Sequence, residues 1–379
     1  MKLFPVYPLF DIELVKGKGA HVYDSKGVEY LDLYGGHAVI SVGHGHKKYN
    51  KALIKQLDQL AYYSNSVKLP IQKKLAKQLG KSSGYKDFDL FLCNSGAEAN
   101  ENALKLASFH TNKRMVIAFE GGFHGRTHGA VAVTDNKKIQ APINQTDHVV
   151  TIPYNNINVL RGALNAYENE IAAVIIEPIQ GVNGIQVADI SYLIELEVLC
   201  KAAGIVLIAD EVQAGYARTG DFFSHQHAGI QPHLITVAKG MGNGFPIGGV
   251  LIHPEIAAWS GMLGTTFGGS PLACAAGLSV LNIIEEENLQ KHARKMGDYL
   301  KSQLQQISKV KEVRGRGLML GIEFDFPIKE LREMLLYKHH ILTGSAKQPN
   351  VIRILPPLNI KKKQLDQFVQ ALAVSLKKL

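Results

Sequence analysis

The spacing of apolar residues changes after about the first fifty positions of the chain. In residues 19–33 apolar and polar positions alternate on either side of the turn 24–27, which predicts an antiparallel β-hairpin. Beyond residue 50, short apolar runs alternate with longer helical stretches, the pattern of parallel strands joined by crossover helices. The predicted strands are 89–93, 115–119, 130–133, 148–152, 172–176, 205–209 and 234–238. Because these runs are almost wholly apolar, we expect helices on both faces of the sheet.

The remaining periodic segments indicate a second, smaller domain. The predicted helices are 98–108, 190–203 and a long one at 272–307, and a final strand is expected at 351–355. We therefore predict an α/β protein with a mostly parallel central sheet in a large domain, residues 49–262. A smaller α+β domain would be built from both chain ends, residues 1–48 and 263–379, with the N-terminal hairpin packed on the C-terminal part.

Composition and charge narrow the class of protein. The 379 residues are 46% hydrophobic and 20% charged, which is ordinary for a globular protein and excludes disordered and fibrous classes. The net charge of +9 is scattered, and its densest stretches are pairs or triplets of lysine such as Lys361–Lys363. These are too short for a nucleic-acid-binding arm, whereas an enzyme with anionic substrates fits the positive charge.

The cysteines and the apolar runs indicate the cellular compartment in which the protein is expected. Cys93, Cys200 and Cys274 are far apart and lie among apolar neighbours, so we expect buried free thiols. Pro5, Pro8 and Asp11 interrupt the N-terminal apolar stretch, which argues against a signal peptide. No apolar run is long enough to span a membrane, so we expect no membrane partner and a cytoplasmic location.

Candidate chemistry lies where the predicted strands end, because ligands of open α/β sheets bind at the carboxyl ends of the strands. After strand 89–93, a turn of small residues opens directly into a helix, where free backbone N–H groups and the helix dipole favour a phosphate. The candidate phosphate ligands are Ser95, Gly96 and Ala97. A plain structural turn is the alternative at this point.

Two further strand ends carry charged residues. Asp210 follows strand 205–209, which is too apolar to tolerate an unpaired charge, so a cationic group should meet it. Lys239 follows strand 234–238 and is flanked by glycines that would let a planar ligand approach. A lysine desolvated there has a lowered pKa and becomes a nucleophilic amine suited to imine formation. The alternative is that Asp210 and Lys239 simply pair with each other.

A fourth strand end combines an aromatic ring with a guanidinium. Phe123 and Arg126 follow a glycine turn after strand 115–119, where the ring could stack on a ligand and the arginine could hold a carboxylate. A phosphate site, an aromatic plate, a carboxylate and a lysine together describe a pocket for pyridoxal 5′-phosphate. In such a pocket the lysine forms an imine and the aspartate keeps the pyridine nitrogen protonated.

These motifs resemble those of the class III aminotransferases, within them the acetylornithine and succinylornithine branch. The resemblance runs from the hairpin 19–33 to residues 350–357. Its motifs are residues 94–100, 122–127, 177–181, 210–213, 238–240 and 264–275. It implies a transferase of fold type I that depends on pyridoxal phosphate.

The resemblance also implies a role for each cofactor residue. Lys239 would carry the cofactor as a Schiff base and shuttle the proton during transamination. Asp210 would pair with the pyridine nitrogen, and Gln213 would hydrogen-bond the 3-oxygen of the ring. Ser95, Gly96 and Ala97 would bind the phosphate, and Phe123 would stack on the ring.

The remaining implied residues concern the partner subunit and the substrates. Thr266 would reach the phosphate in the other subunit, so a homodimer with shared active sites is expected. Arg126, with Thr265 nearby, would hold the α-carboxylate of an N-acylornithine, and Arg353 would receive a carboxylate of 2-oxoglutarate or glutamate. The δ-amino group would pass to 2-oxoglutarate and leave the N-acylglutamate 5-semialdehyde, a step of arginine biosynthesis.

One position departs from the family pattern. Relatives commonly have a glutamate after the 177–181 motif, where it can neutralise the arginine of the final strand, and this chain has Val182 instead. Our hypothesis is that Arg353 stays available in both half-reactions and favours an acyl group with its own carboxylate, such as succinyl. The alternative is that another acidic residue replaces the glutamate.

Other functions remain as rivals. The cofactor residues do not separate an acylornithine aminotransferase from an ornithine or 4-aminobutyrate aminotransferase. A nucleic-acid-binding regulator on the same core would need a helix-turn-helix or a basic arm, and a dinucleotide-binding dehydrogenase would need GxGxxG after a strand; the sequence shows none of these. The histidine pairs lack further ligands at metal-binding spacing, so no metal site is predicted.

Overall fold

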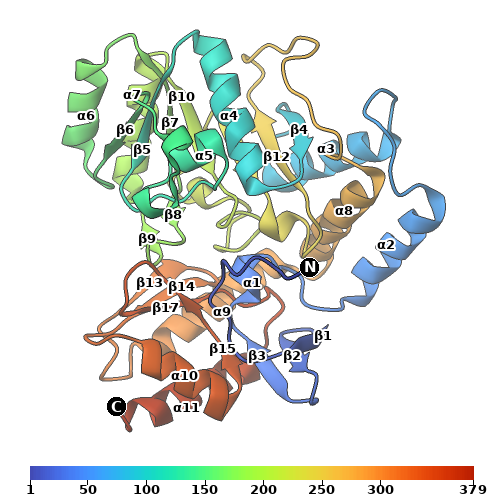
Figure 1. The fold of residues 1–379 in the computed structure, drawn as a ribbon, viewed down its shortest axis with the longest axis vertical. Coiled ribbons are helices and arrows are strands. Elements are labelled where there is room, and N and C mark those ends of the chain that lie inside the picture. The colour runs from blue at the N-terminus through green and yellow to red at the C-terminus, as the bar shows by residue number, and fades with distance from the viewer.

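The computed structural model describes residues 1–379, and a seven-stranded sheet with the order β4-β12-β11-β10-β7-β5-β6 forms its centre (Figure 1). The strands are β4 (Asp89–Cys93), β5 (Met115–Phe119), β6 (Val149–Ile152), β7 (Ile171–Ile176), β10 (Val206–Asp210), β11 (Leu234–Val237) and β12 (Gly248–Ile252). Only β12 runs antiparallel to its neighbours β11 and β4. The predicted mostly parallel sheet is therefore confirmed, with six of the seven predicted strands in it.

One predicted strand was wrong, and one strand of the sheet was not predicted. Residues 130–133 lie in and just after a short helix, α5 (His128–Ala132), and not in a strand. A four-residue apolar run fits either structure, and here the N–H of Ala130 donates to Glu101 Oε1 while the helix packs beside α4. Conversely, β12 was missed because it begins with Gly248 and Gly249, which weaken a strand pattern. A Cβ atom on Gly249 would lie 2.9 Å from the carbonyl oxygen of Phe91 in β4, so glycine permits this close pairing.

Helices cover both faces of the sheet, as the apolar strands predicted. On one face α4 (Gly96–Thr111) buries Ala99 and Ala103 against Ile175 and Ile208. On the other face lie α6 (Ile157–Ala166) and α7 (Ile190–Ala202). Their buried leucines pack against the strand side chains that point to this second face, such as Ile117. The carboxyl ends of the parallel strands β5, β7, β10 and β11 lie at the same edge of the sheet. This edge faces the smaller sheets of the chain (Figure 1).

The rest of the chain forms smaller sheets and helices. The predicted hairpin is confirmed by β2 (His21–Asp24) and β3 (Glu29–Asp32), with β1 (Leu14–Lys18) beside β2. A second sheet contains β13 (Glu312–Arg316), β14 (Met319–Glu323), β17 (Val351–Ile354) and β16 (Gly344–Ser345). The further elements are α1 (Gly35–Ala38), α2 (Lys47–Gln59), α3 (Pro70–Ser83), β8 (Ile179–Gln180), β9 (Gln186–Val187), α10 (Lys329–His339), β15 (Ile341–Leu342) and α11 (Lys362–Leu376).

The predicted long helix 272–307 is instead two helices, α8 (Pro271–Glu286) and α9 (Leu289–Leu304). They are separated at Asn288, whose φ of 52° is left-handed and ends the helical path. Asparagine tolerates this conformation better than most residues. The prediction of one long helix rested on apolar periodicity, which does not detect such a break.

The two ends of the chain meet in one sheet, because β15 pairs in parallel with β3. The domain limits at 48 and 262 stay a prediction, since α8 packs on α2 and α3 and so connects the proposed parts. Cys93, Cys200 and Cys274 are buried free thiols, as predicted. None of the helices combines the length and the apolar composition needed to cross a membrane.

Candidate active site

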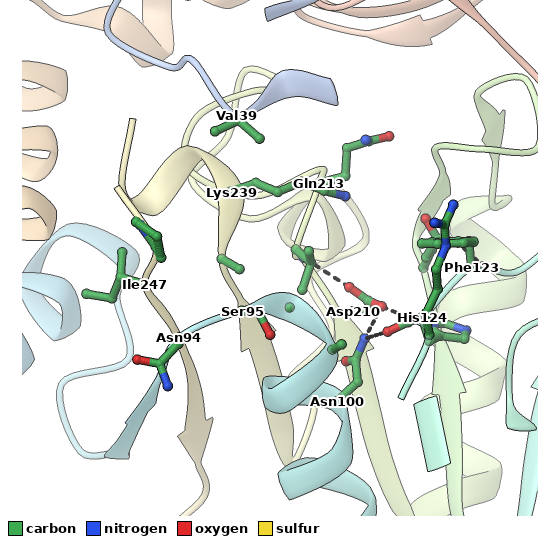
Figure 2. A pocket seen from close by; sticks show the side chains of 18 of the residues that line it. Val39, Asn94, Ser95, Asn100, Phe123, His124, Asp210, Gln213, Lys239 and Ile247 are labelled. Atoms are coloured by element: carbon green, nitrogen blue, oxygen red, sulfur yellow. Dashed lines mark hydrogen bonds and ion pairs between the residues drawn. The ribbon is translucent and has the colours of Figure 1, made fainter. Parts of the chain in front are cut away.

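A cavity of about 400 Å³ lies where the carboxyl ends of β4, β5, β10 and β11 open (Figure 2). Eight residues predicted for the site line it: Ser95, Gly96, Ala97, Phe123, Arg126, Asp210, Gln213 and Lys239. In the close-up, Lys239 and Gln213 lie between Val39 on one side and Ser95 with Asn100 on the other. The four strand ends singled out in the sequence therefore share one cavity.

Lys239 is the nucleophilic group of this cavity. Its side chain is half-buried, and its Nζ forms no hydrogen bond or ion pair with any residue of the chain. Burial lowers the pKa of its amine, and the charge of Arg353 acts in the same direction, against the opposing carboxylates of Asp210 and Glu177. The amine is thus free to react and has a reduced tendency to be protonated.

Asp210 is paired, but with a different partner from the one considered above. Its Oδ2 accepts hydrogen bonds from His124 Nδ1 at 2.7 Å and from Asn100 Nδ2 at 2.8 Å, and its Oδ1 accepts from the Val212 N–H at 3.0 Å. His124 is therefore the cationic group that a buried carboxylate requires. Burial opposes the charged imidazole, but the bond to Asp210 and the charges of Asp210 and Glu177 outweigh burial and raise the pKa of His124.

Glu177 is a second buried carboxylate, and it also lines the cavity. It accepts hydrogen bonds from the N–H groups of Phe123 at 2.9 Å and Gly181 at 3.0 Å. Burial and the nearby charge of Asp210 raise the pKa of Glu177, although His124 and these backbone bonds act against the rise. Its position fixes the backbone that presents the Phe123 ring to the cavity.

Sequence reasoning missed the roles of His124, Asn100 and Glu177. Each lies inside a motif quoted above, but no function was attached to it. The available signal was local: Glu177 directly follows the buried strand β7, and the polar His124 sits beside Phe123, which was chosen for its ring. Asn100 lies one turn inside α4, where a strand-end search does not look.

The turn before α4 is built to hold an anion. Ser95 is the N-cap, and its Oγ accepts from the Glu98 N–H at 3.2 Å. The N–H groups of Gly96 and Ala97 lie in the first turn of α4. No helical turn precedes them, so the helix offers no carbonyl oxygen to accept their hydrogen bonds. A Cβ atom on Gly96 would lie 2.6 Å from Val212 Cγ1, so the close approach of β10 and α4 needs glycine here.

The donors and acceptors of the cavity fit a phosphorylated pyridine aldehyde. Two buried oxygens, Asn100 Oδ1 and Gln213 Oε1, have no hydrogen-bond partner within the chain, although buried polar atoms are normally paired. Together with the free amine of Lys239, the buried carboxylate of Asp210 and the anion-binding turn, they provide groups of the right kind for the amine, ring and phosphate chemistry of pyridoxal phosphate.

Three predicted residues do not line the cavity. Arg353 in β17 is buried beside it and donates to the carbonyl oxygens of Gly181 at 3.0 Å and Ser345 at 2.5 Å. It forms no ion pair within the chain; burial lowers the pKa of Arg353, and the charge of Glu177 opposes this decrease. Thr265 is partly buried, with its Oγ1 accepting from Asn94 Nδ2 at 3.3 Å, and Thr266 is exposed and does not line the cavity.

Comparison with known proteins decides the family. The family description "Aminotransferase class-III" matches residues 6–376. The chain belongs to the class III aminotransferases. It is similar to the acetylornithine aminotransferases of Bacillus anthracis, 39% identical over 97% of this chain and 95% of the relative, and of Bacillus subtilis, 40% identical over 98% and 96%.

Solved structures agree with this membership. The ornithine aminotransferase of Toxoplasma gondii matches with a TM-score of 0.93 at 28% identity, over 99% of this chain and 92% of that one. The acetylornithine aminotransferase of Elizabethkingia anophelis matches with a TM-score of 0.88 at 29% identity, over 100% and 96%. The predictions of fold type I, of a transaminase and of pyridoxal phosphate as cofactor are thereby confirmed.

Proposed function

We propose that this aminotransferase moves the δ-amino group of an N2-acyl-L-ornithine to 2-oxoglutarate, giving the N-acylglutamate 5-semialdehyde and glutamate. The relatives named acetylornithine aminotransferase, which match almost the full chain, support this substrate class. The observation that carries the proposal is the unpaired amine of Lys239, placed in one cavity with the Asp210–His124 pair and the anion-binding turn of Ser95.

Pyridoxal phosphate, when bound, supplies an aldehyde for the amine and a ring that accepts electrons from the substrate carbon. Lys239 would attach it covalently and, once released, would carry the proton between the amine-bearing substrate carbon and the cofactor. Asp210, oriented by the hydrogen bonds from His124 and Asn100, would hold a proton on the ring nitrogen. Ser95, Gly96 and Ala97 would bind the phosphate. Phe123 would stack on the ring, and the Gln213 amide would bind its 3-oxygen.

Two arginines without carboxylate partners are available for the substrates. Arg126 is exposed at the cavity and makes no hydrogen bond or ion pair, so it can hold the α-carboxylate of the donor, and Thr265 would assist it. Arg353 can receive the distal carboxylate of 2-oxoglutarate or glutamate, because its present partners are neutral oxygens. With Val182 in place of an acid, no carboxylate of the chain forms an ion pair with Arg353, which supports our hypothesis of a preference for N-succinylornithine.

The homodimer, the place in arginine biosynthesis and the cytoplasmic location belong to the same proposal. Thr266 is exposed and does not line the cavity of its own chain, as expected of a residue that serves the phosphate of a second subunit. Shared active sites would make the dimer the active form.

Half-reactions test this function directly. The holoenzyme is mixed separately with N-acetylornithine, N-succinylornithine, ornithine or 4-aminobutyrate, and conversion of the bound cofactor to its amine form is followed by absorbance. We expect fast conversion with the acylated donors, fastest with the succinyl donor, and slow conversion with the other two. Faster conversion with ornithine or 4-aminobutyrate would assign a rival activity, and a clear preference for the acetyl donor would end the succinyl hypothesis.

Replacing the lysine tests the mechanism. We expect Lys239→Ala to lose all measurable turnover, because no other amine lies free in the cavity. Borohydride reduction followed by peptide mass spectrometry should find the cofactor on Lys239 of the natural protein and on no residue of the variant. Normal steady-state turnover by Lys239→Ala would contradict the assignment.

A further inference from the structure

Glu211 is a deeply buried carboxylate that does not line the cavity. It directly follows Asp210 at the end of β10, and its side chain is 0% exposed, like that of His225. Its backbone N–H donates to the Thr236 carbonyl oxygen at 3.0 Å, which continues the pairing of β10 with β11. A carboxylate so far from water is tolerated only where hydrogen bonds replace its hydration.

The chain provides these hydrogen bonds from two adjacent residues. Glu211 Oε1 accepts from the Ser224 hydroxyl, the His225 N–H and His225 Nδ1, each at 2.8 Å, and Oε2 accepts from the Ser224 N–H at 2.9 Å. A carboxylate accepts about four hydrogen bonds, so its capacity is filled. Ser224 and His225 begin the 3₁₀ helix η3 (Ser224–Ala228), so the carboxylate ties the end of β10 to the start of this helix.

His225 extends the network to Tyr85. Its Nε2 lies 2.6 Å from Tyr85 Oη, which has no other hydrogen-bond partner in the chain. Burial, followed by the charges of Glu211 and Glu197, raises the pKa of Tyr85, so the phenol keeps its proton. That proton points to Nε2, and the neutral imidazole donates through Nδ1 to the carboxylate. Tyr85, His225 and Glu211 thus form a relay of hydrogen bonds in one direction.

The network closes a loop of the chain. Because Glu211 holds Ser224 and His225, the two ends of the segment between them are fixed together in the interior. Within this loop Tyr216 and Ala217 have φ angles of 56° and 66°, in the left-handed region that side chains disfavour. Such a backbone persists only where its surroundings impose it, and the fixed ends of the loop are part of those surroundings.

Gln213 lies in the first turn of this loop and lines the cavity (Figure 2). The turn is closed by the Gly215 N–H, which donates to the Glu211 carbonyl oxygen at 3.0 Å. Gln213 Nε2 donates to the His37 carbonyl oxygen at 3.1 Å, and Gln213 Oε1 has no partner. The amide therefore keeps one N–H for a ligand, and the direction of that N–H depends on the turn.

We propose that Glu211 is a positioning residue: with Ser224 and the relay to Tyr85 it fixes the loop 211–225, and the loop places the Gln213 amide at the 3-oxygen of pyridoxal phosphate. Glu211 itself touches neither the cofactor nor the substrate. The inference rests on the proposed function, because that function gives Gln213 its place at the ring.

Two properties of the holoenzyme report the place of Gln213 without any turnover. The first is the affinity for pyridoxal phosphate, measured by titration of the cofactor-free protein. The second is the pH at which the absorbance of the bound cofactor changes. The 3-oxygen is negatively charged and shares a proton with the nitrogen that Lys239 contributes, so the loss of a hydrogen bond to this oxygen strengthens its hold on the proton. The midpoint of the absorbance change then moves to higher pH.

A double-mutant cycle tests whether Glu211 acts through Gln213. We expect Glu211→Gln and Gln213→Ala each to raise the midpoint by about 1 and to weaken the affinity for pyridoxal phosphate about tenfold. The double variant should equal Gln213→Ala alone, because the loop then has no amide to place. Effects that add in either measurement, or a Glu211→Gln variant that changes neither, would overturn the positioning role.

Tyr85→Phe decides the question if Glu211→Gln does not fold. It removes only the hydroxyl at the partly exposed end of the relay. We expect it to raise the midpoint by about 0.3 and to weaken the affinity about twofold, with no effect once Gln213 is alanine. Tyr30→Phe is the matched control, because it also removes a bonded hydroxyl, which donates to Asp24 Oδ2 at 3.1 Å, but outside the cavity and the relay. It should change neither property.

The outcomes separate this inference from the proposed function. Equal changes in Tyr85→Phe and Tyr30→Phe would overturn the relay, since they would reflect general destabilisation. If Gln213→Ala changed neither property, the proposed place of Gln213 and the role of Glu211 would both be overturned. A natural enzyme that turns over no N-acylornithine would overturn the proposed substrate, whereas a non-additive cycle would still support the role of Glu211.

Discussion

Asp210 is a buried carboxylate whose three hydrogen bonds leave Lys239 free to react. His124 provides the positive charge, Asn100 a neutral donor, and the Val212 N–H a third bond. A buried charge that lacks such partners is strongly destabilising, so this arrangement stabilises the anion and keeps the amine available at the same time. The histidine is therefore a supporting residue of the site that sequence analysis did not identify.

This pair predicts a specific pH dependence of stability. The folded-state pKa of His124 is raised above its ordinary value of 6.5, so the stabilisation is fully present below that value. It is lost as the pH rises through the folded-state pKa. We expect His124→Ala to lower the free energy of unfolding by about 3 kcal/mol near pH 6, with a difference that shrinks above pH 6.5. Urea unfolding of the holoenzyme between pH 6 and 9 measures it.

Asn100→Ala is the matched control for this prediction. It also removes a donor to Asp210 Oδ2, but the amide does not titrate. Its loss of stability should therefore be the same at each pH in the series. A His124→Ala difference that grows with pH would contradict the assignment of a charged histidine.

At the level of single residues, the sequence predicted what is local to a strand end. Lys239 and Asp210 could be placed because each follows an apolar run whose end must face the ligand edge of the sheet. Arg353 and Thr266 could be named only by resemblance, since their relation to the cavity depends on how distant segments meet.

At the level of elements, β12 and α5 show the limits of hydrophobic pattern. Gly248 and Gly249 make β12 look like a loop, yet their lack of side chains is what lets the strand enter between β4 and β11. The run 130–133 looks like a strand, yet its contact with α4 makes it helical. In both cases the secondary structure of the segment is determined by contacts with another element of the chain, which the local pattern does not reveal.

The start of α4 gives a prediction at this scale. Ser95→Ala removes the cap of the Glu98 N–H and should lower the free energy of unfolding by about 1 kcal/mol. Because Ser95 also lines the cavity, the variant should bind pyridoxal phosphate more weakly. Equilibrium titration of the cofactor, followed by absorbance, measures the change.

Ser270 offers a matched control in a helix of the same length. It caps α8 by accepting from the Ala273 N–H at 3.4 Å, but it does not line the cavity. We expect Ser270→Ala to lose similar stability with no change in cofactor affinity. If both variants weakened cofactor binding equally, the effect would come from general destabilisation and not from the phosphate site.

At the level of the whole molecule, an apolar surface adjoins the loop that carries Thr266. We call it the α2 patch, and it consists of the exposed residues Ile54, Leu57, Leu60, Tyr62 and Phe267. The rings of Tyr62 and Phe267 lie 5.4 Å apart, and Tyr62 Oη donates to the Thr266 carbonyl oxygen at 3.2 Å. Apolar patches of this kind mark interaction surfaces, and a second copy that covers this one would meet Thr266.

The proposed dimer therefore makes a prediction that links assembly to the site. Leu57→Glu places a charge in the α2 patch, where burial against a second copy would leave it without a partner. We expect this variant to sediment as a monomer, to bind the cofactor more weakly and to lose most of its activity. Val374→Glu on α11 is the control, since Val374 is 45% exposed and Leu57 54%, but it lies outside the patch. A monomeric natural enzyme with full activity would show that Thr266 serves no second subunit, and the shared site would then have to be abandoned.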